Sequence, residues 1–336
     1  MNRIPLPDPR CTPLGRHDPK EEKNQLWWSG AGVRFTLDCT YLAAEVTSRH
    51  TAHAAWLGVM ADGAPVARLP LLPGTHLYPL LSGMEKGVAH EITVLKDTQA
   101  GYDESGPVTL EALETDGEIT PAPERKLMLE FIGDSLTVGE GCMGPQSGAE
   151  WRMVYISHMP AFPTLVSEAL GADKRVIALG GWGAARSWDN DPESRIGRIY
   201  DRLCAVIPGG DVPAPEGEKP ADAVIINLGT NDNSAFDRIP LPEQDACRRE
   251  IRCRAAELIR MARKRNPGAY ILWAYGLCGN QLESVLRQAV RDSGDPNAGY
   301  LALTPARSNG SRMHPSRESH ETAAQEIISA LKEHLK

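Results

Sequence analysis

The stretch that decides the fold is LMLEFIGDSL at residues 127–136, where a mostly apolar run ends in glycine, aspartate and serine. A short apolar run of this kind predicts a buried strand. Similar runs follow at 176–179, 223–228, 270–273 and 300–303, and the segments 161–170, 244–265, 282–292 and 318–335 have the pattern of amphipathic helices. Strands that alternate with helices predict an α/β domain with a mostly parallel sheet.

The chain before residue 120 has a different pattern. Short β-type segments lie at 33–37, 54–60, 66–69, 90–95 and 108–113, with turn signals such as Asp62-Gly63 and Pro73-Gly74 between them. Regular strands with intervening turns predict a β-sandwich. The Pro-rich joint Thr120-Pro121-Ala122-Pro123 separates the two patterns. We therefore expect a β-sandwich domain over 1–120 and an α/β domain over 126–336.

Composition limits the classes of partner. The 336 residues carry a net charge of -8, which argues against nucleic acid and favours a neutral or sugar-like substrate. No apolar run has the length of a signal-peptide core or a membrane span, and seven scattered cysteines do not suggest a disulfide framework. We expect a cytoplasmic protein without a membrane partner, and we leave homo-oligomer formation open.

The first candidate for chemistry is Ser135, at the turn after strand 127–132. Residues just past the carboxyl ends of parallel strands meet in one crevice, so a hydroxyl placed there is exposed to a ligand. A serine hydroxyl is a weak nucleophile and needs a base within hydrogen-bonding reach. Asp134 and Ser135 taken alone fit a helix cap equally well.

Two further strand ends offer hydrogen-bond donors. Strand 223–228 runs into Gly229-Thr230-Asn231-Asp232, where the Asn231 amide is a candidate oxyanion donor, typically worth about 3 to 4 kcal/mol. An Asx turn is the structural alternative for Asn231. Strand 176–179 runs into Gly180-Gly181-Trp182-Gly183, where Gly181, or Gly183 as second choice, could bring a backbone N–H close to substrate.

His314 is the candidate base among nine histidines. It follows the last predicted strand and precedes the last predicted helix, and Pro315 favours an extended backbone at His314 that can aim the ring. His314 and His320 are close in sequence, but no Cys or carboxylate cluster accompanies them. We therefore expect no metal and no organic cofactor.

The spaced set Gly133-Asp134-Ser135, Gly181, Gly229-Thr230-Asn231-Asp232 and His314-Pro315 resembles the SGNH (GDSL-like) hydrolases, serine esterases with a flavodoxin-like domain. The resemblance covers residue 127 to the end of the sequence. It implies that Ser135 is the nucleophile and His314 the base. It also implies an oxyanion hole made by the N–H groups of Ser135 and Gly181 and the Asn231 amide.

The whole chain resembles carbohydrate esterase family 2, which joins an N-terminal jelly-roll domain to an SGNH domain and removes acetyl groups from sugars. The motifs that carry this resemblance are Trp27-Trp28-Ser29-Gly30, HEITVLKD at 90–97 and ALGGWGAARSW at 178–188. It implies an acetylesterase acting on a small or oligosaccharide ester. The sugar and the acylated position stay open.

One position departs from the SGNH pattern. These enzymes usually carry an aspartate two or three residues before the histidine, and here Arg312 and Ser311 occupy those positions. In a serine triad the acid orients the imidazole and stabilises its charged form. Its absence predicts a Ser-His dyad or another orienting group, such as a backbone carbonyl.

Substrate contacts are expected from aromatic side chains near the site loops, because aromatic rings stack on sugar faces. The candidates are Trp151, Trp182 and Trp188, together with the site aspartates Asp134 and Asp232. The segment 141–160 is either a lid or a loop docked on the sandwich domain. Two other functions stay open, a lipase or lysophospholipase and a decayed sugar-binding protein.

Overall fold

The computed structural model describes residues 1–101, 103–307 and 309–335, and the chain divides into two compact units. The first unit comprises Met1–Arg125, Arg152–Val154 and Arg202–Glu216. The second comprises Lys126–Trp151, Tyr155–Asp201 and Gly217–Lys336, of which the last residue is outside the description. The chain therefore passes from one unit to the other five times, and the 141–160 segment contributes to both.

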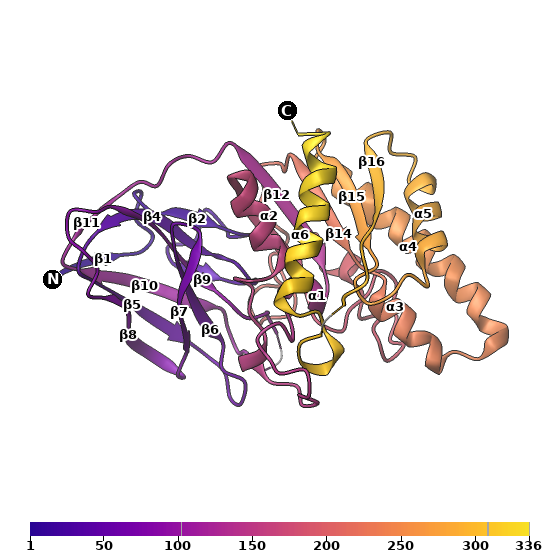
Figure 1. The fold of residues 1–336 in the computed structure, drawn as a ribbon, viewed down its shortest axis with the longest axis horizontal. Helices are drawn as coiled ribbons and strands as arrows, with labels where there is room; N and C mark the ends of the chain where they lie inside the picture. Colours follow the sequence, from indigo (N-terminus) through magenta and orange to yellow (C-terminus); the bar gives the residue numbers. More distant parts are fainter. Residues whose placement is uncertain (102, 308, 336) are drawn as a thin grey trace. The chain divides into compact units, whose positions relative to one another are not determined.

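The first unit is a β-sandwich of two antiparallel sheets (Figure 1). One sheet has the order β1 (Asn2–Pro5), β10 (Val108–Thr115), β5 (Tyr41–Ser48), β8 (Gly74–Ser82), with β3 (Asn24–Leu26) also paired to β10. The other has the order β11 (Glu118–Thr120), β4 (Gly32–Asp38), β9 (His90–Lys96), β6 (Trp56–Ala61), β7 (Ala64–Pro70), with β2 (Thr12–Leu14) paired to β4. The sandwich prediction is confirmed.

The core of the sandwich comes from side chains that alternate along the strands. Phe35, Leu57, Val94 and Leu110 are fully buried and belong to one apolar cluster. Alternation places one face of each strand toward this core. The five predicted segments all lie in or overlap observed strands, and six further strands were not predicted.

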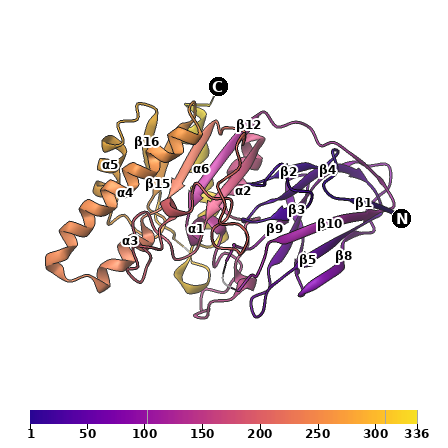
Figure 2. The same ribbon diagram turned by 180° about the vertical axis from the view of Figure 1, so that it is seen from behind.

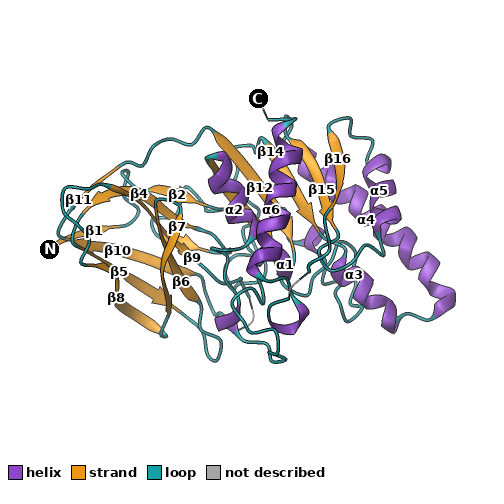
Figure 3. Ribbon diagram, viewed as in Figure 1, coloured by secondary structure: helices purple, strands orange, loops and turns teal. Residues whose placement is uncertain are grey.

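The second unit has a five-stranded sheet in the order β13 (Ala172–Ala178), β12 (Leu127–Gly133), β14 (Ala223–Asn227), β15 (Tyr270–Tyr275), β16 (Ala298–Ala302). Every neighbouring pair is parallel, which confirms the predicted parallel sheet. Helices α2 (Phe162–Leu170) and α6 (Arg317–Lys332) cover one face, and α4 (Gln244–Arg265) covers the other (Figures 2 and 3). Helix α5 (Glu283–Asp292) packs against α4 and the β15–β16 edge. This is the flavodoxin-like doubly wound order.

The register of the sheet brings three loops to one level. Gly133, at the end of β12, pairs with Ala178 of β13 and with Asn227 of β14. The strand order also reverses here, since the chain passes from β12 to β13 on one side and returns to β14 on the other. In such sheets the crevice at the reversal point is where ligands bind.

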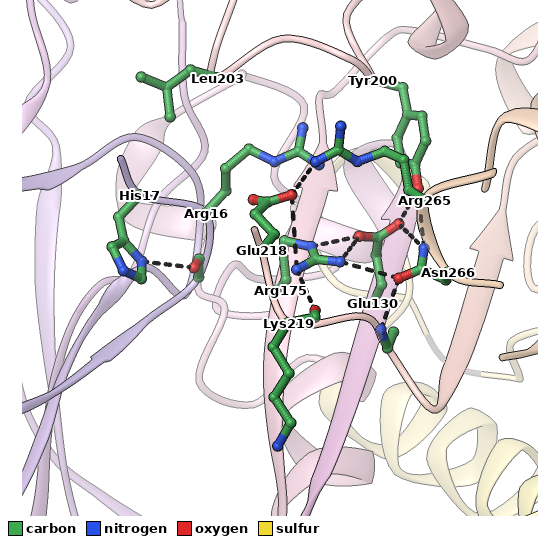
Figure 4. Close-up of polar contacts among 12 residues, drawn as sticks. Arg16, His17, Glu130, Arg175, Tyr200, Leu203, Glu218, Lys219, Arg265 and Asn266 are labelled. Atoms are coloured by element: carbon green, nitrogen blue, oxygen red, sulfur yellow. Dashed lines mark hydrogen bonds and ion pairs between the residues drawn. The ribbon is translucent and has the colours of Figure 1, made fainter. Parts of the chain in front are cut away.

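A buried polar network joins β12 and β13 at Glu130 and Arg175, before the strand ends that carry the site (Figure 4). Glu130 of β12 accepts hydrogen bonds from Arg175 of β13 and from Tyr200. Asn266, just after α4, accepts from the Ala221 N–H at 2.7 Å and also contacts Arg175. Glu130 and Arg175 are both almost inaccessible to solvent, so the pair is a structural ion pair of the second unit.

Candidate active site

Ser135 is the first residue of α1 (Ser135–Val138), directly after β12. Asp134 caps this short helix, because its carboxylate accepts a hydrogen bond from the Leu136 N–H at 3.0 Å. Asp134 therefore provides the predicted cap, and the hydroxyl of the buried Ser135 is left for other contacts. Ser135 retains 6% of its surface.

His314 lies within hydrogen-bonding distance of Ser135. Its Nε2 is 2.9 Å from the Ser135 Oγ, and its Nδ1 is 3.1 Å from the carbonyl oxygen of Arg312. A carbonyl only accepts, so this contact selects the tautomer with hydrogen on Nδ1. Nε2 then has a free lone pair toward the serine hydroxyl, the arrangement that a general base requires.

The loop that carries His314 has unusual backbone geometry. Arg312 (φ 54°, ψ 36°) and Met313 (φ 60°) both adopt the left-handed conformation, which costs a non-glycine residue about 1 to 2 kcal/mol. Hydrogen bonds from Arg312 N–H to the Gly148 carbonyl and from Gly310 N–H to the His314 carbonyl, both 2.7 Å, hold the loop. Met313 projects outward and is 79% exposed.

Gly141 lies directly against this loop. A Cβ atom on Gly141 would be 2.6 Å from the Cβ of His314 and 2.6 Å from the Ser311 carbonyl oxygen. No real Cβ approaches another carbon this closely. A side chain at residue 141 would therefore move the base.

Asn231 lies at the start of α3 (Thr230–Ser234), after β14. Its side-chain nitrogen donates to the Asp134 carboxylate at 3.1 Å and to the Trp182 carbonyl at 2.8 Å. These contacts join the loops after β12, β13 and β14, so the structure brings Ser135, Asn231 and the glycine loop together as predicted.

The glycine loop supplies a candidate backbone donor. Within the described ranges, neither the Gly181 N–H nor the Ser135 N–H has a protein hydrogen-bond partner. Gly183 is occupied differently, since it bridges to Arg195, and a Cβ there would be 2.4 Å from an Asp232 oxygen. The geometry therefore favours Gly181 over Gly183 as the second donor.

Asp134 and Asp232 are fully buried, in contrast to the expectation that they contact substrate. Asp232 accepts hydrogen bonds from the backbone N–H groups of Ala184, Ala185 and Arg186 at 2.8, 2.7 and 3.2 Å. Burial raises the pKa of Asp134 to about 8 and also raises the pKa of Asp232. Both groups are bound inside the protein and have no surface left for a sugar.

The three predicted tryptophans differ in exposure. Trp188 is 49% exposed and lies over Gly181, where a Cβ would be 3.1 Å from the indole Cδ1. Trp151 and Trp182 are partly buried. Trp188 is therefore the one of the three that presents a large ring surface beside a candidate oxyanion donor.

Sequence reasoning missed Glu140, a buried carboxylate 3.8 Å from the His314 Nε2. The available signal was its place between two glycines, five residues after Ser135. His320, by contrast, is buried and stacks on Phe162. The described part of the chain contains no group of three His, Cys, Asp or Glu side chains arranged to hold a metal ion, and none of its helices is long and apolar enough to cross a membrane.

Comparison with known proteins identifies the family. Residues 131–334 match the GDSL-like lipase/acylhydrolase family. The chain belongs to this family. Residues 14–123 match the N-terminal domain of carbohydrate esterase 2, so the resemblance expected from the sequence is confirmed for both halves of the chain.

Relatives of this chain are described as esterases. It is 26% identical over 327 residues to the cellulase/esterase CelE of Acetivibrio thermocellus, covering 92% of this chain and 37% of that protein. It is 22% identical to an acetylxylan esterase / glucomannan deacetylase of Cellvibrio japonicus, covering 98% of this chain and 90% of that protein. The chain thus spans little more than a third of the Acetivibrio protein.

A solved structure has the same architecture. The acetyl xylan esterase Est2A of the rumen bacterium Butyrivibrio proteoclasticus matches with a TM-score of 0.92 and 27% identity. The match covers 99% of this chain and 98% of that one. The combination of a β-rich N-terminal domain with a GDSL-like domain is therefore shared by both proteins.

Proposed function

We propose that the protein is a serine esterase that removes acetyl groups from carbohydrates, with Ser135 as nucleophile and His314 as base. The observation that carries the proposal is the 2.9 Å contact between the Ser135 Oγ and the His314 Nε2. Nucleophile and base within this distance, with the base oriented by a third group, is the arrangement that activates a serine hydroxyl. The third group is the Arg312 carbonyl.

The reaction takes place in two acyl-transfer steps. His314 accepts the proton of Ser135 while Oγ attacks the ester carbonyl, and the protonated ring then donates that proton to the departing sugar oxygen. Water repeats the sequence on the acyl-enzyme and releases acetate. The ring carries hydrogen on both nitrogens at the intermediate, and its Nδ1–H continues to donate to the Arg312 carbonyl.

The developing oxyanion is assigned to the Ser135 N–H, the Gly181 N–H and the Asn231 amide. The two backbone groups have no protein acceptor in the described structure and are available to the substrate. Asn231 donates its two amide hydrogens to Asp134 and Trp182 in this structure, so it has to give up or share one of these contacts when it binds the oxyanion. Asp134 and Asp232 support this site, because they fix the amide and the Ala184–Arg186 backbone.

Substrate recognition is assigned first to Trp188. An exposed indole beside the proposed oxyanion hole is a platform for a sugar ring. Trp182 and Trp151 stay in the proposal as partial contacts. The relatives described as acetylxylan esterase and glucomannan deacetylase support an acetylated polysaccharide or oligosaccharide as the substrate class.

The proposal also assigns a role to each domain and a cellular compartment to the protein. Residues 126–336 carry the chemistry, and residues 1–120 form the accompanying sandwich domain. None of the seven cysteines forms a disulfide, which supports a reducing, cytoplasmic compartment and therefore an imported oligosaccharide. Release of the native protein into the culture medium would contradict this location.

The test compares hydrolysis of 4-nitrophenyl acetate and 4-nitrophenyl octanoate by the wild type and by Ser135→Ala. We expect rapid turnover of the acetate, slow turnover of the octanoate, and a loss of at least about a thousandfold in the variant, because the nucleophile is absent. Thermal unfolding checks that the variant is folded.

Each outcome has a defined meaning. A preference for octanoate would replace the acetylesterase with a lipase-type esterase. Equal hydrolysis by wild type and variant would remove Ser135 from the mechanism. Binding of oligosaccharides with no hydrolysis by the wild type would instead identify a sugar-binding protein.

A further inference from the structure

A buried carboxylate lies beside the proposed base, on the side opposite to the Arg312 carbonyl. The Glu140 side chain is only 7% exposed, and its Oε1 is 3.8 Å from the His314 Nε2. The same oxygen accepts a hydrogen bond from the Arg312 guanidinium at 2.8 Å. The imidazole therefore has a carbonyl oxygen near Nδ1 and a carboxylate oxygen near Nε2.

Glu140 is also tied to the nucleophile through the backbone. Its N–H donates to the carbonyl of Ser135 at 2.9 Å, one turn after the serine. Its side chain reaches Arg312, which is 172 positions further along the chain. A single residue thus connects the turn that carries Ser135 with the loop that carries His314.

Arg312 connects the pair to the orientation of the ring. Its left-handed backbone turns its own carbonyl back toward the imidazole, and its side chain is anchored on Glu140. A left-handed non-glycine residue is held only where its surroundings fix it. The Arg312–Glu140 ion pair is one of the contacts that fix it.

We propose that Glu140 and Arg312 are positioning residues that together do the work of the absent triad acid. This proposal rests on the proposed function. Arg312 orients the ring through its carbonyl, and Glu140 stabilises the ring after it has taken the Ser135 proton onto Nε2. Glu140 accepts no proton, since the proton passes from Oγ to Nε2 and then to the leaving sugar oxygen.

The shared oxygen of Glu140 limits the effect of its charge. Because Arg312 binds that oxygen directly, its positive charge opposes part of the attraction between the carboxylate and a protonated ring. Without the Arg312 guanidinium, the carboxylate would attract a protonated ring more strongly. The opposite charges therefore act on the base in opposite directions.

Of the other titratable groups in the described structure, His320 of α6 interacts electrostatically with His314, and Asp134 interacts with Glu140 and Asp232. Arg317 and Glu318 begin α6, three and four positions after His314. Burial lowers the pKa of His320 to about 4, so this ring is neutral near pH 7. Burial, with help from the charges of Asp232 and Glu140, raises the pKa of Asp134 to about 8. Glu318 hydrogen bonds to Ser316, and Arg317 contacts Met143.

The test uses two charge-neutralising variants, Glu140→Gln and Arg312→Met, and the pH profile of kcat/KM for 4-nitrophenyl acetate. Arg312→Met retains the backbone carbonyl and the length of the side chain. We expect Glu140→Gln to lower kcat about 10- to 100-fold and to move the acidic limb to lower pH, because the protonated ring loses a nearby negative charge. We expect Arg312→Met to move the acidic limb to higher pH.

The control is Glu283→Gln, which removes the Glu283–Arg287 pair at the surface of α5 and should leave kcat and the pH profile unchanged. KM for the small ester should stay within about twofold in all variants. The proposal would be overturned if the acidic limb moved in the same direction in both variants. It would also be overturned if the variants lost thermal stability but kept the wild-type pH profile. Should Glu140→Gln fail to fold, the Arg312→Met profile decides alone.

The outcome is separable from that of the proposed function. If Ser135→Ala is inactive but both charge variants keep the wild-type profile, the esterase assignment stands and the positioning role fails. If Ser135→Ala retains full activity, the esterase assignment itself fails.

Discussion

Gly141 shows how little space a single residue of this site has. The atom nearest to its missing Cβ belongs to His314, and its backbone is in the left-handed region with φ of 80°. We expect Gly141→Ala to lower kcat by about 100-fold or more, because displacing a catalytic group by about 1 Å costs about that much. Steady-state hydrolysis of 4-nitrophenyl acetate measures it.

Gly294 provides a matched control. It has φ of 71°, and nothing lies within 4 Å of its missing Cβ. Gly294→Ala therefore carries the same kind of backbone strain, about 1 kcal/mol, without the contact. Equal losses of activity in both variants would mean that backbone strain, and not the contact with His314, causes the loss of activity in Gly141→Ala.

At this scale the sequence predicted the residues that follow strand ends, and it did not predict their support. Ser135, Asn231 and His314 stand in positions that a parallel sheet makes recognisable. Glu140 meets Arg312 across 172 positions, and the carbonyl that orients the ring has no side-chain signature. Only the folded loop brings these groups together.

Between elements, Glu130 of β12 and Arg175 of β13 form a buried ion pair. We expect Glu130→Gln to lower the free energy of unfolding by about 3 to 5 kcal/mol, because Arg175 then stays buried with a lost partner. The double variant Glu130→Gln/Arg175→Met should recover most of this loss. Urea unfolding of both variants gives the values.

The exposed pair of Glu283 and Arg287 serves as the control for this unfolding measurement. Its removal by Glu283→Gln should change the free energy of unfolding by about 0.5 kcal/mol or less. A similarly small change for Glu130→Gln would show that water reaches Arg175 and that the network in Figure 4 is not sealed.

The buried pair of Glu130 and Arg175 explains why the start of β13 was not predicted from the sequence. Strand β13 begins at Ala172, four residues before the predicted start, because Asp173, Lys174 and Arg175 interrupt its apolar pattern. Pairing buries Arg175 in spite of its charge. In the sandwich, β8 was missed for a related reason: it is largely exposed, contains Pro79 and lies at a sheet edge.

For the whole molecule, buried histidines predict loss of stability in acid. Burial lowers the pKa of His320 to about 4, whereas the unfolded value is 6.5. The folded state then binds fewer protons than the unfolded state between these values, so stability falls as the pH drops from 6.5 to 4. The full difference is about 3 kcal/mol.

We expect His320→Gln to lose about 3 kcal/mol less than the wild type between pH 7 and pH 4, measured by urea unfolding at each pH. Burial also lowers the pKa of His158, and the charge of His320 contributes to that shift, so the His320→Gln variant removes this contribution as well. Parallel losses in the two proteins would assign the acid sensitivity to other groups.

The tight approach at Gly141 and Gly183 has a consequence for how such a protein changes its specificity. The inner wall of the site has no room for added atoms, because new side chains there would collide with His314 or Asp232. Trp188 and Met313, which project to solvent at the rim, can be exchanged without displacing the reacting groups. Adaptation to a new ester would therefore accumulate at the rim, and a library randomised at these two positions should be far richer in active clones than one randomised at the two glycines.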